Sequence, residues 1–151
     1  PRTINGLIGI PFSPFLHGGV FHIASNTIPL FILIFLLFTF YKKESFQTVT
    51  IIILLGGSLV WLFGRNSYHI GASGLIYGLV AFLISSGIFR KNPVSIIISV
   101  VIFLLYGGLI YGLFPTRSYI SWEGHLFGAV SGVFCGYIYG KPRISKNREK
   151  N

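Results

Sequence analysis

Five apolar runs of helix length, separated by short charged or polar loops, constrain this chain more than any other feature. A helix that crosses a bilayer core about 30 Å thick needs about 20 apolar residues. Only 10% of the residues are charged, whereas a soluble domain has about 25%. The sequence therefore predicts an all-α membrane protein, a polytopic helical bundle within a domain of residues 1–140. Its five transmembrane helices are expected at residues 20–41, 48–63, 71–89, 94–114 and 124–140.

The two ends of the chain differ from these runs. Residues 1–19 are apolar but broken by Pro1, Pro11 and Pro14, so we expect them at the membrane interface rather than across it. Residues 141–151 are polar and basic and are predicted to form a cytoplasmic tail. The first residue is not Met, and five spans place the two ends on opposite sides of the membrane. We therefore expect a further helix upstream.

The distribution of Lys and Arg orients the bundle. Nine of the 12 basic residues fall on one side of the predicted spans, and the positive-inside rule makes that side cytoplasmic. Membrane topology thus explains the net charge of +9, and no nucleic-acid partner is predicted. The nine are Lys42, Lys43, Arg90, Lys91, Lys141, Arg143, Lys146, Arg148 and Lys150, and the other three are Arg2, Arg65 and Arg117.

Polar residues lie at one level near the outer ends of three predicted helices. His22 and Asn26 share a face of the first helix, Ser73 begins the third, and His125 begins the fifth. Polar groups in a membrane are costly and are functional by default. Any one of them could instead join neighbouring helices by a hydrogen bond. Four such residues from three helices indicate a site.

Ser73 stands in the sequence Gly71-Ala72-Ser73-Gly74 at the head of a predicted helix. The first N–H groups of a helix have no partner inside it, and they carry the positive end of its dipole. A developing oxyanion would be stabilised there, as acyl transfer requires. Alternatively, these small residues only allow tight helix packing.

Glycines predict close contact between the third and fifth helices. Gly74 and Gly78 lie on the third, and the fifth has a glycine at every fourth position. Such ridges let helix backbones approach closely, which would bring His125 within hydrogen-bond reach of Ser73. Tyr77 could then stack on the imidazole. The glycines of the fifth helix are Gly124, Gly128, Gly132, Gly136 and Gly140.

Taken in order, these motifs resemble the rhomboid family of intramembrane serine proteases. The matching pieces are His17-Gly18-Gly19-Val20-Phe21-His22 with Asn26, Gly71-Ala72-Ser73-Gly74 with Tyr77, and Gly124-His125 with Gly128 and Gly132. The family commonly has Ala before the catalytic histidine, where this chain has Gly124.

The resemblance implies a six-helix core, of which the first helix would be missing here. It implies Ser73 as nucleophile, His125 as general base, and an oxyanion site from His22, Asn26 and the Ser73 N–H. It further implies transmembrane protein substrates that are cleaved near their outer ends. The site would open to the outside of a bacterial cytoplasmic membrane.

The residue inventory is compatible with a Ser–His dyad. A serine needs a base, and the Asp that orients histidine in soluble triads cannot occur because the chain has no Asp. Glu123 is too close in sequence to His125 to orient it well, so Tyr77 is the expected orienting group. An aspartyl protease is excluded, no H-E-x-x-H zinc motif occurs, and neither cofactor nor metal is expected.

Hydrolysis requires water and access for the substrate. His17, Ser25, Asn66, His69 and Ser121 are predicted to line an aqueous pocket open to the outside. The fourth helix, with Gly107, Gly108 and Gly112, is a candidate lateral gate, and residues 115–123 are a candidate cap. Alternatively, these glycines only allow packing.

Two other functions remain open. One is a rhomboid-like pseudoprotease, which would bind membrane proteins without cleaving them. The other is a channel or transporter, which would need polar residues through the inner halves of the helices, where this chain is almost entirely apolar.

Overall fold

The computed structural model describes residues 1–115 and 120–140. These residues form helices and no strand, which confirms the predicted all-α bundle. The predicted tail and residues 116–119 of the predicted cap lie outside the described residues. The elements are α1 (Ile4–Phe12), the 3₁₀ helix η1 (Ser13–Phe15), α2 (Val20–Phe40), α3 (Ser45–Phe63), α4 (Ser73–Arg90), α5 (Pro93–Tyr106), the 3₁₀ helix η2 (Gly107–Leu113) and α6 (Trp122–Gly140).

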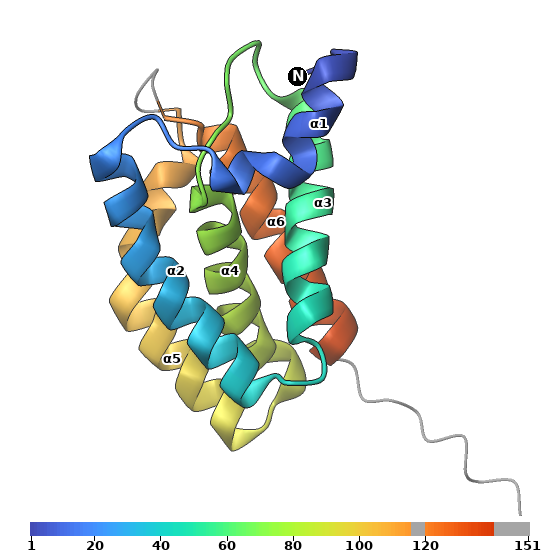
Figure 1. The fold of residues 1–151 in the computed structure, drawn as a ribbon. Coiled ribbons are helices and arrows are strands. Elements are labelled where there is room, and N and C mark those ends of the chain that lie inside the picture. The colour runs from blue at the N-terminus through green and yellow to red at the C-terminus, as the bar shows by residue number, and fades with distance from the viewer. Residues whose placement is uncertain (116–119, 141–151) are drawn as a thin grey trace, which may run out of the picture.

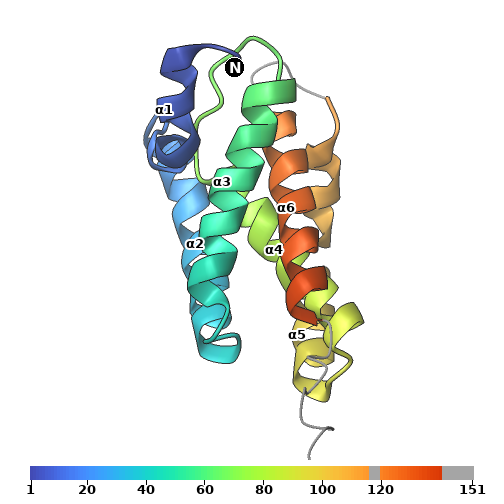
Figure 2. The same ribbon diagram turned by 90° about the vertical axis from the view of Figure 1, so that its right-hand side faces the viewer.

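The long helices run in alternating directions through the bundle (Figure 1). Within the described residues, four segments are long and apolar enough to cross a membrane: α2, α3, α4, and α5 together with η2. The chain is therefore an integral, multi-pass membrane protein. The fifth predicted span, α6, is as long as α3, with 19 residues. It is less apolar than α3 because it contains Glu123, His125 and several glycines. It runs beside α4 in both views (Figures 1 and 2).

Helix α4 is the centre of the bundle. It contacts α2, α3, α5 and α6, and most of its side chains from Leu75 to Gly87 are buried. The outer helices expose large apolar side chains, including Phe31, Phe35 and Leu104. Such an apolar surface is unusual for a soluble monomer and fits contact with lipid.

The α4–α6 interface depends on the predicted glycines. A Cβ atom added to Gly128 would overlap the carbonyl oxygen of Gly74, and one added to Gly132 would overlap the carbonyl oxygen of Gly78. The prediction of close backbone contact between these two helices is therefore confirmed. Because backbone opposes backbone, neither position can accept a side chain without separating the helices.

The N-terminal segment contains no spanning helix, as predicted. Helix α1 has nine residues and lies beside the C-terminal part of α3 (Figure 2). The Thr3 hydroxyl caps it by accepting from the Gly6 N–H at 3.0 Å. The Trp61 indole donates to the Thr3 carbonyl at 2.9 Å, and Arg2 donates to the Gly64 carbonyl at 2.8 Å. These bonds fasten the segment to the end of α3.

The fourth predicted helix differs from the observed one. The sequence predicted a single helix over residues 94–114, but α5 ends at Tyr106 and the chain continues as the 3₁₀ helix η2. Gly107 and Gly108 begin η2, and glycine has a low helix propensity, so the α-helix ends where they occur. The remaining predicted boundaries differ by up to three residues.

Candidate active site

A tight turn brings Ser73 to the first position of α4. Gly71 has φ +108°, a backbone conformation that is strained for any residue with a side chain. A Cβ atom there would also lie 2.6 Å from Nε2 of His22. The Gly71 N–H donates to the Ser13 carbonyl at 2.9 Å, which ties the turn to η1. Gly71 is therefore required by both the backbone conformation and the neighbouring imidazole.

The structure brings Ser73 and His125 together. Oγ of Ser73 lies 2.9 Å from Nε2 of His125, and Nδ1 of the same ring lies 2.9 Å from the Gly112 carbonyl oxygen. A carbonyl can only accept a hydrogen bond, so Nδ1 carries the proton of the neutral ring. Nε2 is then free to accept the Ser73 hydroxyl proton. This is the tautomer that a general base for Ser73 requires.

Tyr77 and Gly112 hold the His125 ring. The Tyr77 ring stacks on it with a centroid separation of 4.1 Å and an interplanar angle of 3°. Both side chains are buried. A Cβ atom on Gly112 would overlap the Tyr77 hydroxyl. Only glycine at this position therefore lets its carbonyl reach the His125 ring while Tyr77 stacks on that ring. Sequence reasoning identified Tyr77 but missed the Gly112 carbonyl, because a backbone acceptor leaves no signal in the side chains.

His22 lies beside the turn that precedes Ser73. Its Nδ1 accepts from the Gly18 N–H at 3.4 Å, so the neutral ring carries its proton on Nε2, on the side that faces Gly71. Asn26 is buried, and its amide donates to the His22 carbonyl at 2.7 Å. Among the described contacts, none joins Asn26 to Ser73 or to another helix.

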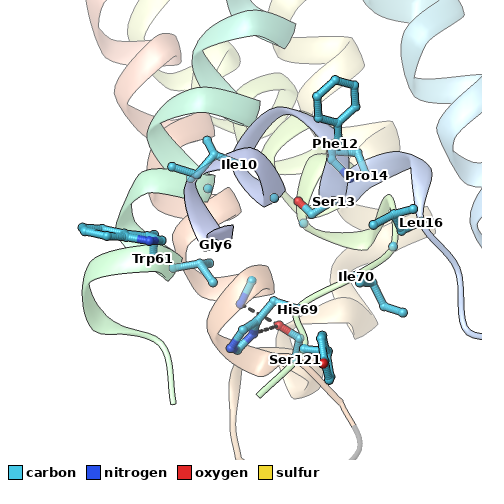
Figure 3. Close-up of a pocket in the computed structure, with 18 of the residues that line it drawn as sticks. Gly6, Ile10, Phe12, Ser13, Pro14, Leu16, Trp61, His69, Ile70 and Ser121 are labelled. Atoms are coloured by element: carbon cyan, nitrogen blue, oxygen red, sulfur yellow. Dashed lines mark hydrogen bonds between the residues drawn. The ribbon is translucent and has the colours of Figure 1, made fainter. Parts of the chain in front are cut away.

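A cavity of about 910 Å³ reaches Ser73 from the side of α1 and α3. Apolar residues such as Ile10 line most of it, and polar side chains gather near the α3–α4 loop (Figure 3). Asn66, His69 and Ser121 line it as predicted. The prediction was wrong for His17 and Ser25, which do not line the cavity. The His17 ring packs on His22, and the Ser25 hydroxyl donates to the His22 carbonyl.

The glycines of the predicted gate behave differently from one another. A Cβ atom on Gly108 would meet nothing within 4 Å, and one on Gly107 would meet only the Phe103 ring at 3.7 Å. Packing therefore does not explain these two glycines, whereas Gly112 is tightly packed. No residue of α5 or η2 lines the cavity, so the gate stays a prediction.

The Glu123 carboxylate does not orient the His125 ring, whose Nδ1 contacts the Gly112 carbonyl instead. Its Oε1 pairs with Nε of Arg65 at 3.3 Å. In the described part of the chain, no group of three or more His, Cys, Asp or Glu residues could hold a metal ion.

The arrangement is that of a serine hydroxyl hydrogen-bonded to a histidine within a membrane protein. A family model for the Rhomboid domain matches residues 5–142. The chain therefore belongs to the rhomboid family.

Named relatives are similar to the chain over most of its length. Uncharacterized proteins of Mycobacterium tuberculosis and Mycobacterium bovis are each 39% identical over 94% of the chain and 63% of their own length. Rhomboid-related protein 1 of Caenorhabditis elegans is 29% identical over 82% of the chain and 37% of its own length. The chain thus spans less than two thirds of these relatives. No solved structure gives a significant match.

Proposed function

We propose that the protein is an intramembrane serine endopeptidase with Ser73 as nucleophile and His125 as general base. The observation that carries this proposal is the pair of hydrogen bonds on the His125 ring. The Gly112 carbonyl holds the proton on Nδ1, and Nε2 accepts from the Ser73 hydroxyl. Rhomboid family membership supports the same chemistry.

In the proposed reaction, Nε2 of His125 takes the Ser73 proton while Oγ attacks the scissile carbonyl carbon. The Ser73 N–H at the start of α4 and Nε2–H of His22 would donate to the resulting oxyanion. The imidazolium gives its proton to the leaving amine, and an acyl-enzyme remains on Ser73. A water molecule, deprotonated by His125, then hydrolyses the ester. One N–H of the Asn26 amide is engaged with the His22 carbonyl, so Asn26 would donate to the oxyanion through its second N–H.

The proposed substrates are transmembrane helices of other proteins, cleaved near their outer ends. Helical hydrogen bonds hide the peptide bonds of such a segment, so it must unwind locally before attack. The cavity beside Ser73, with Asn66 and His69 in its wall, would supply water. The charge distribution supports a site open to the outside, and the mycobacterial relatives support a bacterial cytoplasmic membrane.

The test is labelling with a fluorophosphonate, which reacts with activated serines. Wild-type protein in detergent should be labelled and should cleave a model transmembrane substrate, and Ser73→Ala should do neither. Substrate binding without labelling or cleavage by the wild type would support the pseudoprotease instead.

A further inference from the structure

The loop between α3 and α4, residues 64–72, is fastened to the start of α6 by Arg65. The Arg65 Nε lies 3.3 Å from Oε1 of Glu123, and the Arg65 backbone N–H donates to the same oxygen at 3.3 Å. The guanidinium Nη2 also donates to the Ile120 carbonyl. Arg65 thus engages both the first turn of α6 and the chain that leads into it.

A second connection joins His69 to Ser121 (Figure 3). The His69 Nε2 lies 3.0 Å from the Arg65 carbonyl, which can only accept, so Nε2 carries the proton. The Ser121 hydroxyl therefore donates to Nδ1, at 2.6 Å. Its oxygen also accepts from the Gly124 N–H at 3.3 Å and so caps α6. Ser121 thus joins the α3–α4 loop to the start of α6.

These connections lie directly before the two members of the proposed dyad. His69 precedes Ser73 by four residues, and Ser121 precedes His125 by four residues. The segments that carry Ser73 and His125 are thus joined on one side by the loop contacts. On the other side they are joined by the Gly74–Gly128 backbone contact.

The Arg65–Glu123 ion pair places a charged carboxylate where little water reaches it. Glu123 is 3% exposed, and its Oε2 has no hydrogen-bond partner among the described residues. The Arg65 side chain is partly exposed, but removing it would leave the buried Glu123 carboxylate without its partner, which is costly, while replacing both partners by neutral groups is often neutral for stability. Stability alone is therefore a weak reason for this pair beside the site.

We propose that Arg65, His69, Ser121 and Glu123 form a clamp that positions His125 against Ser73. They act through the start of α6 and touch no reacting atom. The inference rests on the proposed function of Ser73 and His125, and it adds positioning residues to that site.

The test compares Arg65→Gln, Glu123→Gln and the double variant in detergent. The matched control is Arg90→Gln, which removes the other described ion pair, between Arg90 Nη2 and Glu44 Oε2 at 3.4 Å, at the opposite end of α4. Three quantities are measured for each protein: melting temperature, rate of Ser73 labelling by a fluorophosphonate, and kcat and KM for a model transmembrane substrate.

The expected pattern separates positioning from stability. Arg65→Gln should melt lower, and its kcat and labelling rate should fall by about tenfold or more with little change in KM, because small displacements of catalytic groups are costly. The double variant should recover most of the melting temperature yet stay slow. Arg90→Gln should melt lower and keep its rate.

Either of two results would overturn the clamp. One is a double variant that regains wild-type rates together with its stability. The other is an equal loss of rate in Arg90→Gln at an equal loss of melting temperature. A wild type without Ser73-dependent labelling would refute the proposed function itself, and the clamp with it.

Discussion

The carbonyl oxygen of Gly112 lies 2.9 Å from Nδ1 of His125, so a residue without a side chain decides which imidazole nitrogen faces Ser73. In soluble triads a carboxylate orients the histidine, and this chain has no Asp. In the proposed site, the backbone acceptor and the stacked Tyr77 ring would take the place of that carboxylate. A neutral acceptor also avoids placing a charge inside the membrane, where charges are costly.

Gly112→Ala should reduce proteolysis strongly. The added methyl group would overlap the Tyr77 hydroxyl, so the carbonyl and the stacked rings must shift. A displacement of about 1 Å at a catalytic group can cost about a hundredfold in rate. Gly108→Ala is the matched control, because its Cβ would meet nothing within 4 Å. Cleavage of a model transmembrane substrate by both variants is the measurement, and equal rates would remove Gly112 from the site.

Ser73→Ala and His125→Ala should each abolish labelling and cleavage while the bundle still folds. Residues that act as one catalytic unit are strongly non-additive, so the double variant should be no slower than either single variant. Circular dichroism and melting in detergent check the fold. Appreciable turnover by Ser73→Ala would end the serine-protease proposal.

His22→Ala should slow cleavage more than Asn26→Ala does. One lost oxyanion donor costs roughly 3–4 kcal/mol, about a hundred- to a thousandfold in rate. The proton of His22 faces the turn before Ser73, whereas one of the two N–H donors of Asn26 is already engaged with the His22 carbonyl. Cleavage rates per folded molecule and melting temperatures distinguish an oxyanion donor from a residue that only stabilises the helix. An Asn26→Ala variant that loses stability and keeps its rate would assign Asn26 to the helix alone.

The sequence predicted those parts of the site that depend on the type and spacing of side chains. The spacing of Gly74, Gly78, Gly128 and Gly132 predicted the backbone contact, because small residues at helical intervals have few other uses in a membrane. Ser73 and His125 both lie in the first turn of a predicted helix that starts on the same side of the membrane, so the sequence placed them at similar depth.

Features that depend on the tertiary arrangement could not be predicted. The Gly112 carbonyl contributes through backbone geometry, and it belongs to the 3₁₀ helix η2 that replaces the predicted α-helix after Tyr106. The Arg65–Glu123 pair joins residues far apart in the sequence, and neither residue belongs to a recognisable motif. His17 and Ser25 were assigned to the cavity by polarity alone, but His22 engages both.

Cysteine labelling tests the orientation. In a Cys135→Ala background, which removes the buried native thiol, an impermeant maleimide applied from outside should reach single cysteines in residues 64–68. Cysteines at positions 42 and 90 should react only after permeabilisation, since the positive-inside rule makes that end cytoplasmic. The reverse pattern would place the Ser73 site on the cytoplasmic side.

The spacing between α4 and α6 should matter for activity mainly near the Ser73–His125 pair. Gly128→Val would drive side-chain atoms into the Gly74 carbonyl, one residue from Ser73, whereas Gly140→Val would meet Phe89 near the other end of α4. The two positions are about 18 Å apart by helix rise. Both variants should melt at lower temperature, because close packing holds membrane helices together.

Only Gly128→Val should also lose about a hundredfold or more in cleavage rate per folded molecule, because the shift reaches the reacting pair. Melting in detergent and cleavage of a model transmembrane substrate measure the two effects separately. Gly128→Ala and Gly140→Ala repeat the comparison with a smaller side chain where valine prevents folding. Equal rates in the matched variants would show that the glycine contact does not set the distance between Ser73 and His125.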